Sequence, residues 1–132
     1  MPFFLLGRLI FGGFFLFNGL NHFLSYSMMT QYAAAKGVPF AGVLVPIAGA
    51  LLVFGGASIV LGWRPDLGVG AVVLFLLPVT VLMHNFWAEA GAERMNDTIN
   101  FLKNFALVGA TLMLVAIPQP WPYSVETRGT FA

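Results

Sequence analysis

Polar side chains that form hydrogen bonds are concentrated at three places in an otherwise apolar sequence. They are amides, imidazoles and charged groups: Asn18, Asn21 and His22, then His84, Asn85 and Glu89, then Asn100, Lys103 and Asn104. Asn18 and His22 are four residues apart, and so are Asn100 and Asn104, which places each pair on one face of a helix. One hypothesis is that these groups together form a binding or reaction site for a small lipophilic molecule.

The same residues allow two other interpretations. Asn side chains between membrane helices often serve packing alone, at about 0.6–2 kcal/mol per contact. His22 and His84, on different helices at one depth, would suit a b-type haem, but two histidines are weak support and haem is the less favoured interpretation. The chain has no cysteine, which excludes thiolate metal sites, and we predict no metal site. It also lacks the common nucleotide-binding and nucleophile motifs, so enzymatic activity is left open.

The composition places the chain in a membrane. Of its 132 residues, 59% are hydrophobic and 8% are charged, whereas a soluble domain carries about 25% charged residues. Too few polar side chains remain to cover a surface that faces water, so the expected partner is the lipid bilayer. The net charge is +1 and the sequence has no basic run, which argues against nucleic-acid binding.

A helix needs about 20 mostly apolar residues to cross a bilayer core. The segments that meet this condition are 3–24, 43–61, 67–83 and 99–117. Their unbroken apolar runs indicate helices rather than the alternating strands of a barrel. We therefore predict an all-α fold, an integral membrane four-helix antiparallel bundle in which residues 1–132 form one domain. The first segment contains Arg8 and no small-residue cleavage motif follows it, so we expect it to be retained.

The connections between the spans decide which polar groups meet. Gly62 and Pro65 predict a tight turn between the second and third spans. Residues 25–42 form a longer connection, with a short surface helix that begins near Met28 and ends at Gly37. We expect residues 88–98 to be a linker that holds most of the acidic side chains. The first and third spans run in the same direction, so their ends and the start of the fourth span should place the three polar groups in one layer.

Four crossings put both termini on one side of the membrane. The basic residues divide equally between the two faces, with Arg8, Arg64 and Arg128 on the terminus side and Lys36, Arg94 and Lys103 on the other. The preference of Lys and Arg for the cytoplasm therefore hardly favours either membrane orientation. We expect the termini to lie in the cytoplasm. Inside the first span, Arg8 either extends toward the membrane surface or pairs with Asp66 or with backbone carbonyls at a helix end.

Several short motifs, in order along nearly the whole chain, carry a family resemblance. They are Gly7-Arg8, Asn18-Gly19 with His22, Tyr32 with Lys36-Gly37-Val38-Pro39, Gly55-Gly56, Gly62, His84-Asn85-Phe86-Trp87 and Phe101-Leu102-Lys103-Asn104. With these motifs and its four spans, the chain resembles the DoxX family of small bacterial four-helix membrane proteins.

The resemblance implies a multi-pass protein of the bacterial inner membrane. Related DoxD-type chains are associated with thiosulfate:quinone oxidoreductase, and some DoxX members with membrane redox and stress-defence assemblies. The implied function is a redox-linked component that binds a quinone or similar lipophile and works with a redox partner protein or as a homo-oligomer. No site residues are carried over from the family. The candidate binding residues come from the polar layer described above and are Asn18, His22, His84, Asn85, Lys103 and Asn104. The chain departs from the family pattern at Leu52. Many members have an acidic residue at this position, three residues before the glycine pair.

Two other functions are retained as hypotheses. The first alternative is a non-enzymatic membrane anchor or assembly subunit, in which the polar residues only pack helices together. A small-molecule transporter ranks last, because four short spans form a pore only as an oligomer and the few charged residues offer no ion path.

Overall fold

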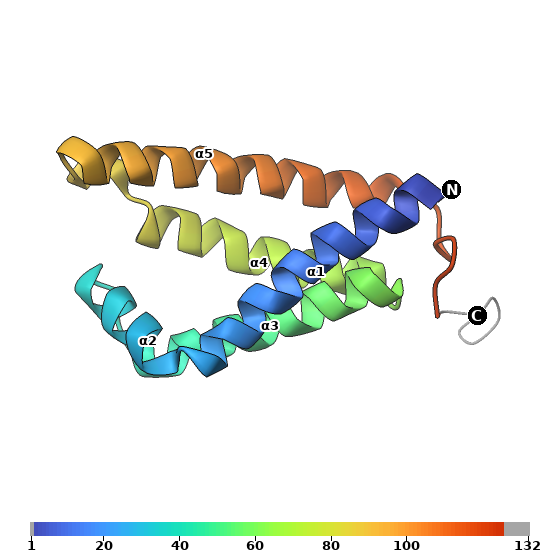
Figure 1. The fold of residues 1–132 in the computed structure, drawn as a ribbon, viewed down its shortest axis with the longest axis horizontal. Coiled ribbons are helices and arrows are strands. Elements are labelled where there is room, and N and C mark those ends of the chain that lie inside the picture. Colours follow the sequence, from blue (N-terminus) through green and yellow to red (C-terminus); the bar gives the residue numbers. More distant parts are fainter. Residues whose placement is uncertain (1, 126–132) are drawn as a thin grey trace.

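The computed structural model describes residues 2–125, and every regular element within that range is a helix. The long helices are α1 (Pro2–Leu24), α3 (Ala41–Leu61), α4 (Pro65–Met83) and α5 (Gly91–Met113), and the shorter ones are α2 (Tyr26–Ala35), η1 (Phe86–Ala88) and η2 (Leu114–Ala116) (Figure 1). Four segments are long and apolar enough to cross a membrane: α1, α3, α4 with η1, and α5 with η2. This confirms the predicted all-α membrane fold.

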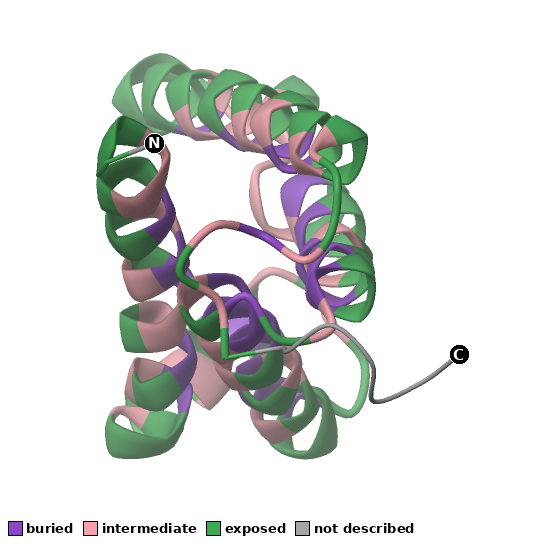
Figure 2. Ribbon diagram, turned by 90° about the vertical axis from the view of Figure 1, so that its right-hand side faces the viewer, coloured by how far each residue is buried: buried purple, intermediate pink, exposed green. Residues whose placement is uncertain are grey.

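The helices pack in a chain of neighbours. Helix α1 lies along α3, α3 forms a hairpin with α4, and α4 packs against α5. Helices α1 and α5 approach each other at the end that holds the N-terminus and diverge toward the end where α2 lies (Figure 1). Buried residues face the inside of this arrangement, and exposed residues face outward (Figure 2). The outward face carries large apolar side chains, as expected for lipid contact.

Glycines set the close contact between α1 and α3. A Cβ atom on Gly56 would lie 2.7 Å from the carbonyl oxygen of Gly12, and one on Gly19 would lie 2.9 Å from the carbonyl oxygen of Gly49. These contacts are with backbone, which cannot move aside as a flexible side chain does. The two helices therefore approach by the small-residue packing common in membranes. Leu52 lies fully buried in the adjacent core beside Phe15 and Ile59.

The structure corrects one predicted boundary. Helix α5 begins at Gly91, so the expected linker over residues 88–98 is wrong beyond its first residues, and the expected start at residue 99 is too late. The predicted start was too late because the first two turns of α5 are polar, and we placed the start of the helix where the apolar run begins. Gly91 adopts φ +61°, which turns the chain into the helix after the extended Ala90.

The other connections agree with the sequence analysis. Helix α2 confirms the short surface helix, and Gly37 follows it with a φ of +84°. The turn between α3 and α4 places Gly62 in the left-handed region and Pro65 at the start of α4. Helix α4 ends at Met83 as predicted, and the chain bends there before η1. Arg128, counted above on the terminus side, lies outside the described residues.

Candidate functional site

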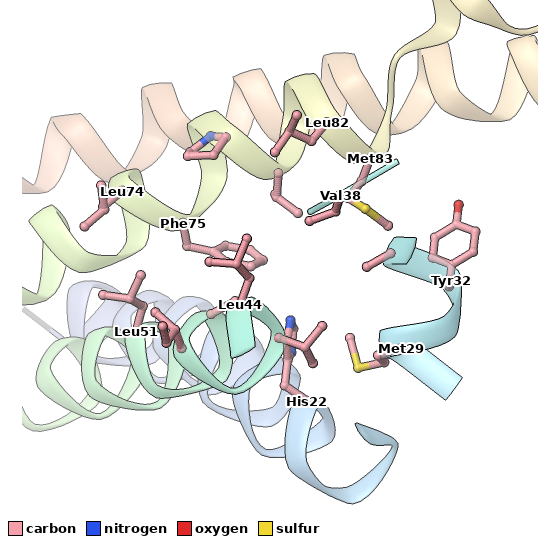
Figure 3. Close-up of a pocket in the computed structure, with 16 residues that line it drawn as sticks. His22, Met29, Tyr32, Val38, Leu44, Leu51, Leu74, Phe75, Leu82 and Met83 are labelled. Carbon is pink, nitrogen blue, oxygen red and sulfur yellow. The ribbon is translucent and has the colours of Figure 1, made fainter. Parts of the chain in front are cut away.

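A cavity of about 250 Å³ opens where α1 and α2 diverge from α4 (Figure 3). Its walls are almost entirely apolar and come from α1 to α4, with side chains that include Met29, Leu44, Leu51, Phe75, Leu82 and Met83. An apolar cavity of about 150 Å³ is large enough to bind benzene. The cavity therefore has room for a substituted ring.

His22 supplies a polar group to this cavity. Its side chain comes from the last turn of α1 and extends into the cavity (Figure 3), and the residue is 8% exposed. Nδ1 lies 2.7 Å from the carbonyl oxygen of Asn18, so in the neutral ring Nδ1 carries the hydrogen and Nε2 is an acceptor. Within residues 2–125, Nε2 has no hydrogen-bond partner. The edge of the ring faces Phe75, with ring centroids 5.8 Å apart.

A second polar site joins three segments of the chain near the same end of the molecule. The ammonium of Lys36 lies 2.6 Å from Oδ2 of Asp97, 3.1 Å from Oε1 of Glu89 and 3.5 Å from Oδ1 of Asn85. The other oxygen of Asp97, Oδ1, lies 3.2 Å from Nδ1 of His84. We call these five residues the Lys36 cluster. It ties the segment after α2 to the end of α4 and to the first turns of α5.

The electrostatics of the Lys36 cluster centre on Asp97. The Asp97 side chain is only 4% exposed and the Lys36 side chain 13%, so the pair is largely withdrawn from water. The hydrogen bond to Asp97 raises the pKa of Lys36 above its ordinary value, which keeps the ammonium charged. Val38 and Met83 line the cavity. Val38 follows Lys36 by two residues and Met83 precedes His84 by one, so the Lys36 cluster is next to one wall of the cavity in the sequence.

The six residues predicted to bind a ligand do not meet in one cavity. His22 lines the cavity, whereas His84 and Asn85 belong to the Lys36 cluster. The Asn18 amide donates to the carbonyl oxygen of Phe14 on its own helix. Lys103 is exposed and bonds Asn100, and Asn104 is 7% exposed on the inner face of α5. The expected single layer is thus divided, and a ligand-binding role for each residue stays a prediction.

Lys36 and Asp97 are the site residues that sequence reasoning missed. Asp97 was placed in the supposed linker, although it precedes Asn104 by two helical turns and shares its helix face. The buried positions Asp97, Asn104, Val108 and Thr111 follow this spacing. Extending the helical period of α5 toward the N-terminus would have found Asp97. No sequence pattern places Lys36 opposite Asp97.

Arg8 occupies the opposite end of the molecule. Its Nη1 donates to the carbonyl oxygen of Pro122 at 2.8 Å, and Nη2 donates to that of Tyr123 at 3.0 Å. The suggested pairing with Asp66 is wrong, because Asp66 faces Arg64 at 3.8 Å. The backbone carbonyls that hold Arg8 belong to the C-terminal tail.

Comparisons with known proteins agree with the architecture. Residues 3–85, more than half of the chain, match the DoxX family. Inner membrane protein YphA of Escherichia coli (strain K12) is 28% identical over 114 residues, which cover 86% of this chain and 81% of that relative. No solved structure matches the chain. Four membrane-spanning segments and the family match make this a multi-pass membrane protein that belongs to the DoxX family.

Proposed function

We propose that this protein binds a small lipophilic ring compound, such as a quinone, in the cavity at His22 and serves as a redox-linked component of the membrane. The observation that carries the proposal is the Nε2 atom of a buried histidine, which has no hydrogen-bond partner among the described residues and lies in an apolar cavity of about 250 Å³. Pockets with apolar walls and few polar groups are typical of sites for small lipophilic molecules. A redox partner protein or a second copy of the chain would exchange electrons with the bound compound.

The chemistry of His22 suits both redox states of a quinone. The neutral imidazole accepts a hydrogen bond at Nε2 from the hydroxyl group of a quinol. The protonated imidazole donates from Nε2 to the carbonyl oxygen of a quinone. The apolar side chains around it would hold the ring, with Phe75 beside the imidazole.

A thermal-shift titration tests this proposal. Decylubiquinol, whose hydroxyl groups can donate to Nε2 of the neutral ring, and decylubiquinone, which can accept from the protonated ring, should raise the melting temperature of the detergent-purified protein. Decylbenzene, which has no oxygen atoms, should raise it less. His22→Phe should remove the difference between these oxygen-bearing compounds and decylbenzene, and His22→Gln should retain part of it.

Filling the cavity provides a matched control. Ala48 lines the cavity and Ala50 is exposed on the same helix. Ala48→Phe should abolish the quinone shift, and Ala50→Phe should preserve it. A wild-type protein that quinone never stabilises would contradict the proposal.

The anchor or assembly function is the second candidate, favoured by the buried polar side chains of α5, Asp97, Asn104 and Thr111. It predicts that His84→Ala and Asn104→Ala lower the melting temperature while quinone has no effect on the wild type. Co-purification of a stoichiometric partner protein would support this alternative.

A further inference from the structure

The guanidinium of Arg8 is a buried cation without an acidic partner among residues 2–125. Arg8 is 3% exposed, and its two hydrogen bonds are to neutral carbonyl oxygens of the tail. The four ion pairs in this range involve other residues. A buried charge is normally paired, because carbonyl dipoles do not neutralise it.

The guanidinium also retains unused hydrogen-bonding capacity. An arginine carries five N–H donors, and the tail carbonyls take one from Nη1 and one from Nη2. The Nε atom is buried and has no hydrogen-bond partner in the part of the chain that the structure describes. The rings of Phe4 and Trp121 lie 5.8 and 5.9 Å from the central carbon and hold the group in place.

Arg8 also lines a second cavity. This cavity has a volume of about 260 Å³ and lies between α1 and the end of α5, far from the cavity at His22 along the helices. Apart from Arg8, its lining is formed by apolar residues and a glycine, among them Phe3, Phe11, Ala110, Leu114 and Ile117. These side chains suit a hydrocarbon chain, and Arg8 is the charged residue in the lining.

We infer that the cavity between α1 and α5 binds an anionic lipid, with its carboxylate or phosphate oxygens at Arg8 and its acyl chain along the apolar wall. Charge complementarity argues for this occupant, because an oxyanion supplies both the missing negative charge and acceptors for the unused N–H groups. The position of Arg8 along the membrane normal also agrees with a lipid headgroup at this site. Arg8 lies in the second turn of α1, level with Gly62 at the end of α3, which places it near a membrane surface.

Lipid titrations of the delipidated protein in a neutral detergent test the inference. Oleate and phosphatidylglycerol should raise the melting temperature, whereas methyl oleate and phosphatidylcholine should not. Inorganic phosphate at matched ionic strength distinguishes a lipid from a free anion. An equal shift with phosphate alone, or with the neutral lipids, would overturn the inference.

Paired variants separate binding from folding. Arg8→Gln should weaken oleate binding at least about tenfold, as expected for a lost charge-assisted hydrogen bond, and Arg64→Gln on the same face should not. Because Arg8→Gln is a core substitution, Ala110→Phe provides a second variant that fills the cavity and leaves Arg8 intact. It should abolish the lipid shift, whereas Ala106→Phe, at an exposed position one turn away on α5, should retain it.

The acidic residue of the tail, Glu126, requires its own control. If Arg8 binds a lipid, Glu126→Gln should leave the oleate shift unchanged. If Glu126→Gln lowers stability as much as Arg8→Gln and alters the lipid response equally, the counter-ion belongs to the chain and the inference is overturned.

Discussion

Lys36 and Asp97 are 61 residues apart in sequence, yet Nζ of Lys36 lies 2.6 Å from Oδ2 of Asp97. This contact joins the connection after α2 to the beginning of α5. It lies toward the end of the molecule at which α1 and α5 diverge (Figure 1). Val38 and Met83, which line the cavity at His22, are close in sequence to residues of the Lys36 cluster.

Removing the charge of Asp97 should destabilise the fold. Asp97→Asn leaves the ammonium of Lys36 without its strongest partner, and we expect a loss of about 3 kcal/mol in the free energy of unfolding, the lower end for a broken buried pair. Denaturant titration in detergent measures this loss. Glu93→Gln, at an exposed position in the first turn of α5, is the matched control and should change stability by less than about 0.5 kcal/mol.

A double-mutant cycle isolates the contact itself. Lys36→Met, Asp97→Asn and the double variant should show a coupling free energy of about 1–3 kcal/mol. Strict additivity of the two single substitutions would contradict a direct interaction in the folded protein.

Alkaline pH should weaken the same contact. The Asp97 carboxylate raises the pKa of Lys36 above its ordinary 10.5, so the folded state holds this proton more tightly than the unfolded state. The stabilisation is therefore complete below about pH 10.5 and is lost as the pH rises through the folded-state pKa. Melting curves between pH 8 and pH 12 should show this additional loss in the wild type. A similar additional loss in Lys36→Met would assign it to other groups.

Helix packing gives a sharp contrast between two glycines. Gly56→Ala places a Cβ atom 2.7 Å from the carbonyl oxygen of Gly12, so we expect a loss of about 1–3 kcal/mol or failure to accumulate in membranes. A Cβ atom on Gly13 would meet nothing within 4 Å. Gly13→Ala should therefore be neutral or stabilise α1 by up to about 1 kcal/mol. Equal effects of both substitutions on thermal stability would argue against close packing of α1 on α3.

Membrane orientation can be measured with single cysteines, because the chain has none of its own. Ser27→Cys is on α2 and Asp66→Cys is at the turn between α3 and α4, at opposite ends of the spans. With cytoplasmic termini, a membrane-impermeant maleimide should label Ser27→Cys in intact cells and Asp66→Cys only after permeabilisation. The reverse labelling would place the termini outside the cytoplasm.

The membrane environment and the architecture follow from the amino-acid sequence alone. Four long apolar runs in a chain with 8% charged residues leave membrane-spanning helices as the stable arrangement, because backbone groups in lipid must bond within each helix. The turn residues Gly37, Gly62 and Pro65 also predicted the connections correctly, because they act through local backbone geometry. The start of α5 was missed because polar residues 91–98 carry no apolar pattern, although they continue the same helix.

Which polar groups contact one another depends on how the helices pack in three dimensions. Spacing within one helix predicts a shared face, as for Asn18 and His22, but it does not give the rotation of that helix against its neighbours. Packing turns His22 toward an apolar cavity, directs His84 to Asp97 and leaves Lys103 on the outside. The partners of Lys36 and Arg8 come from segments at least 49 and 114 residues away, and contacts over such distances depend on how the helices pack rather than on any local pattern.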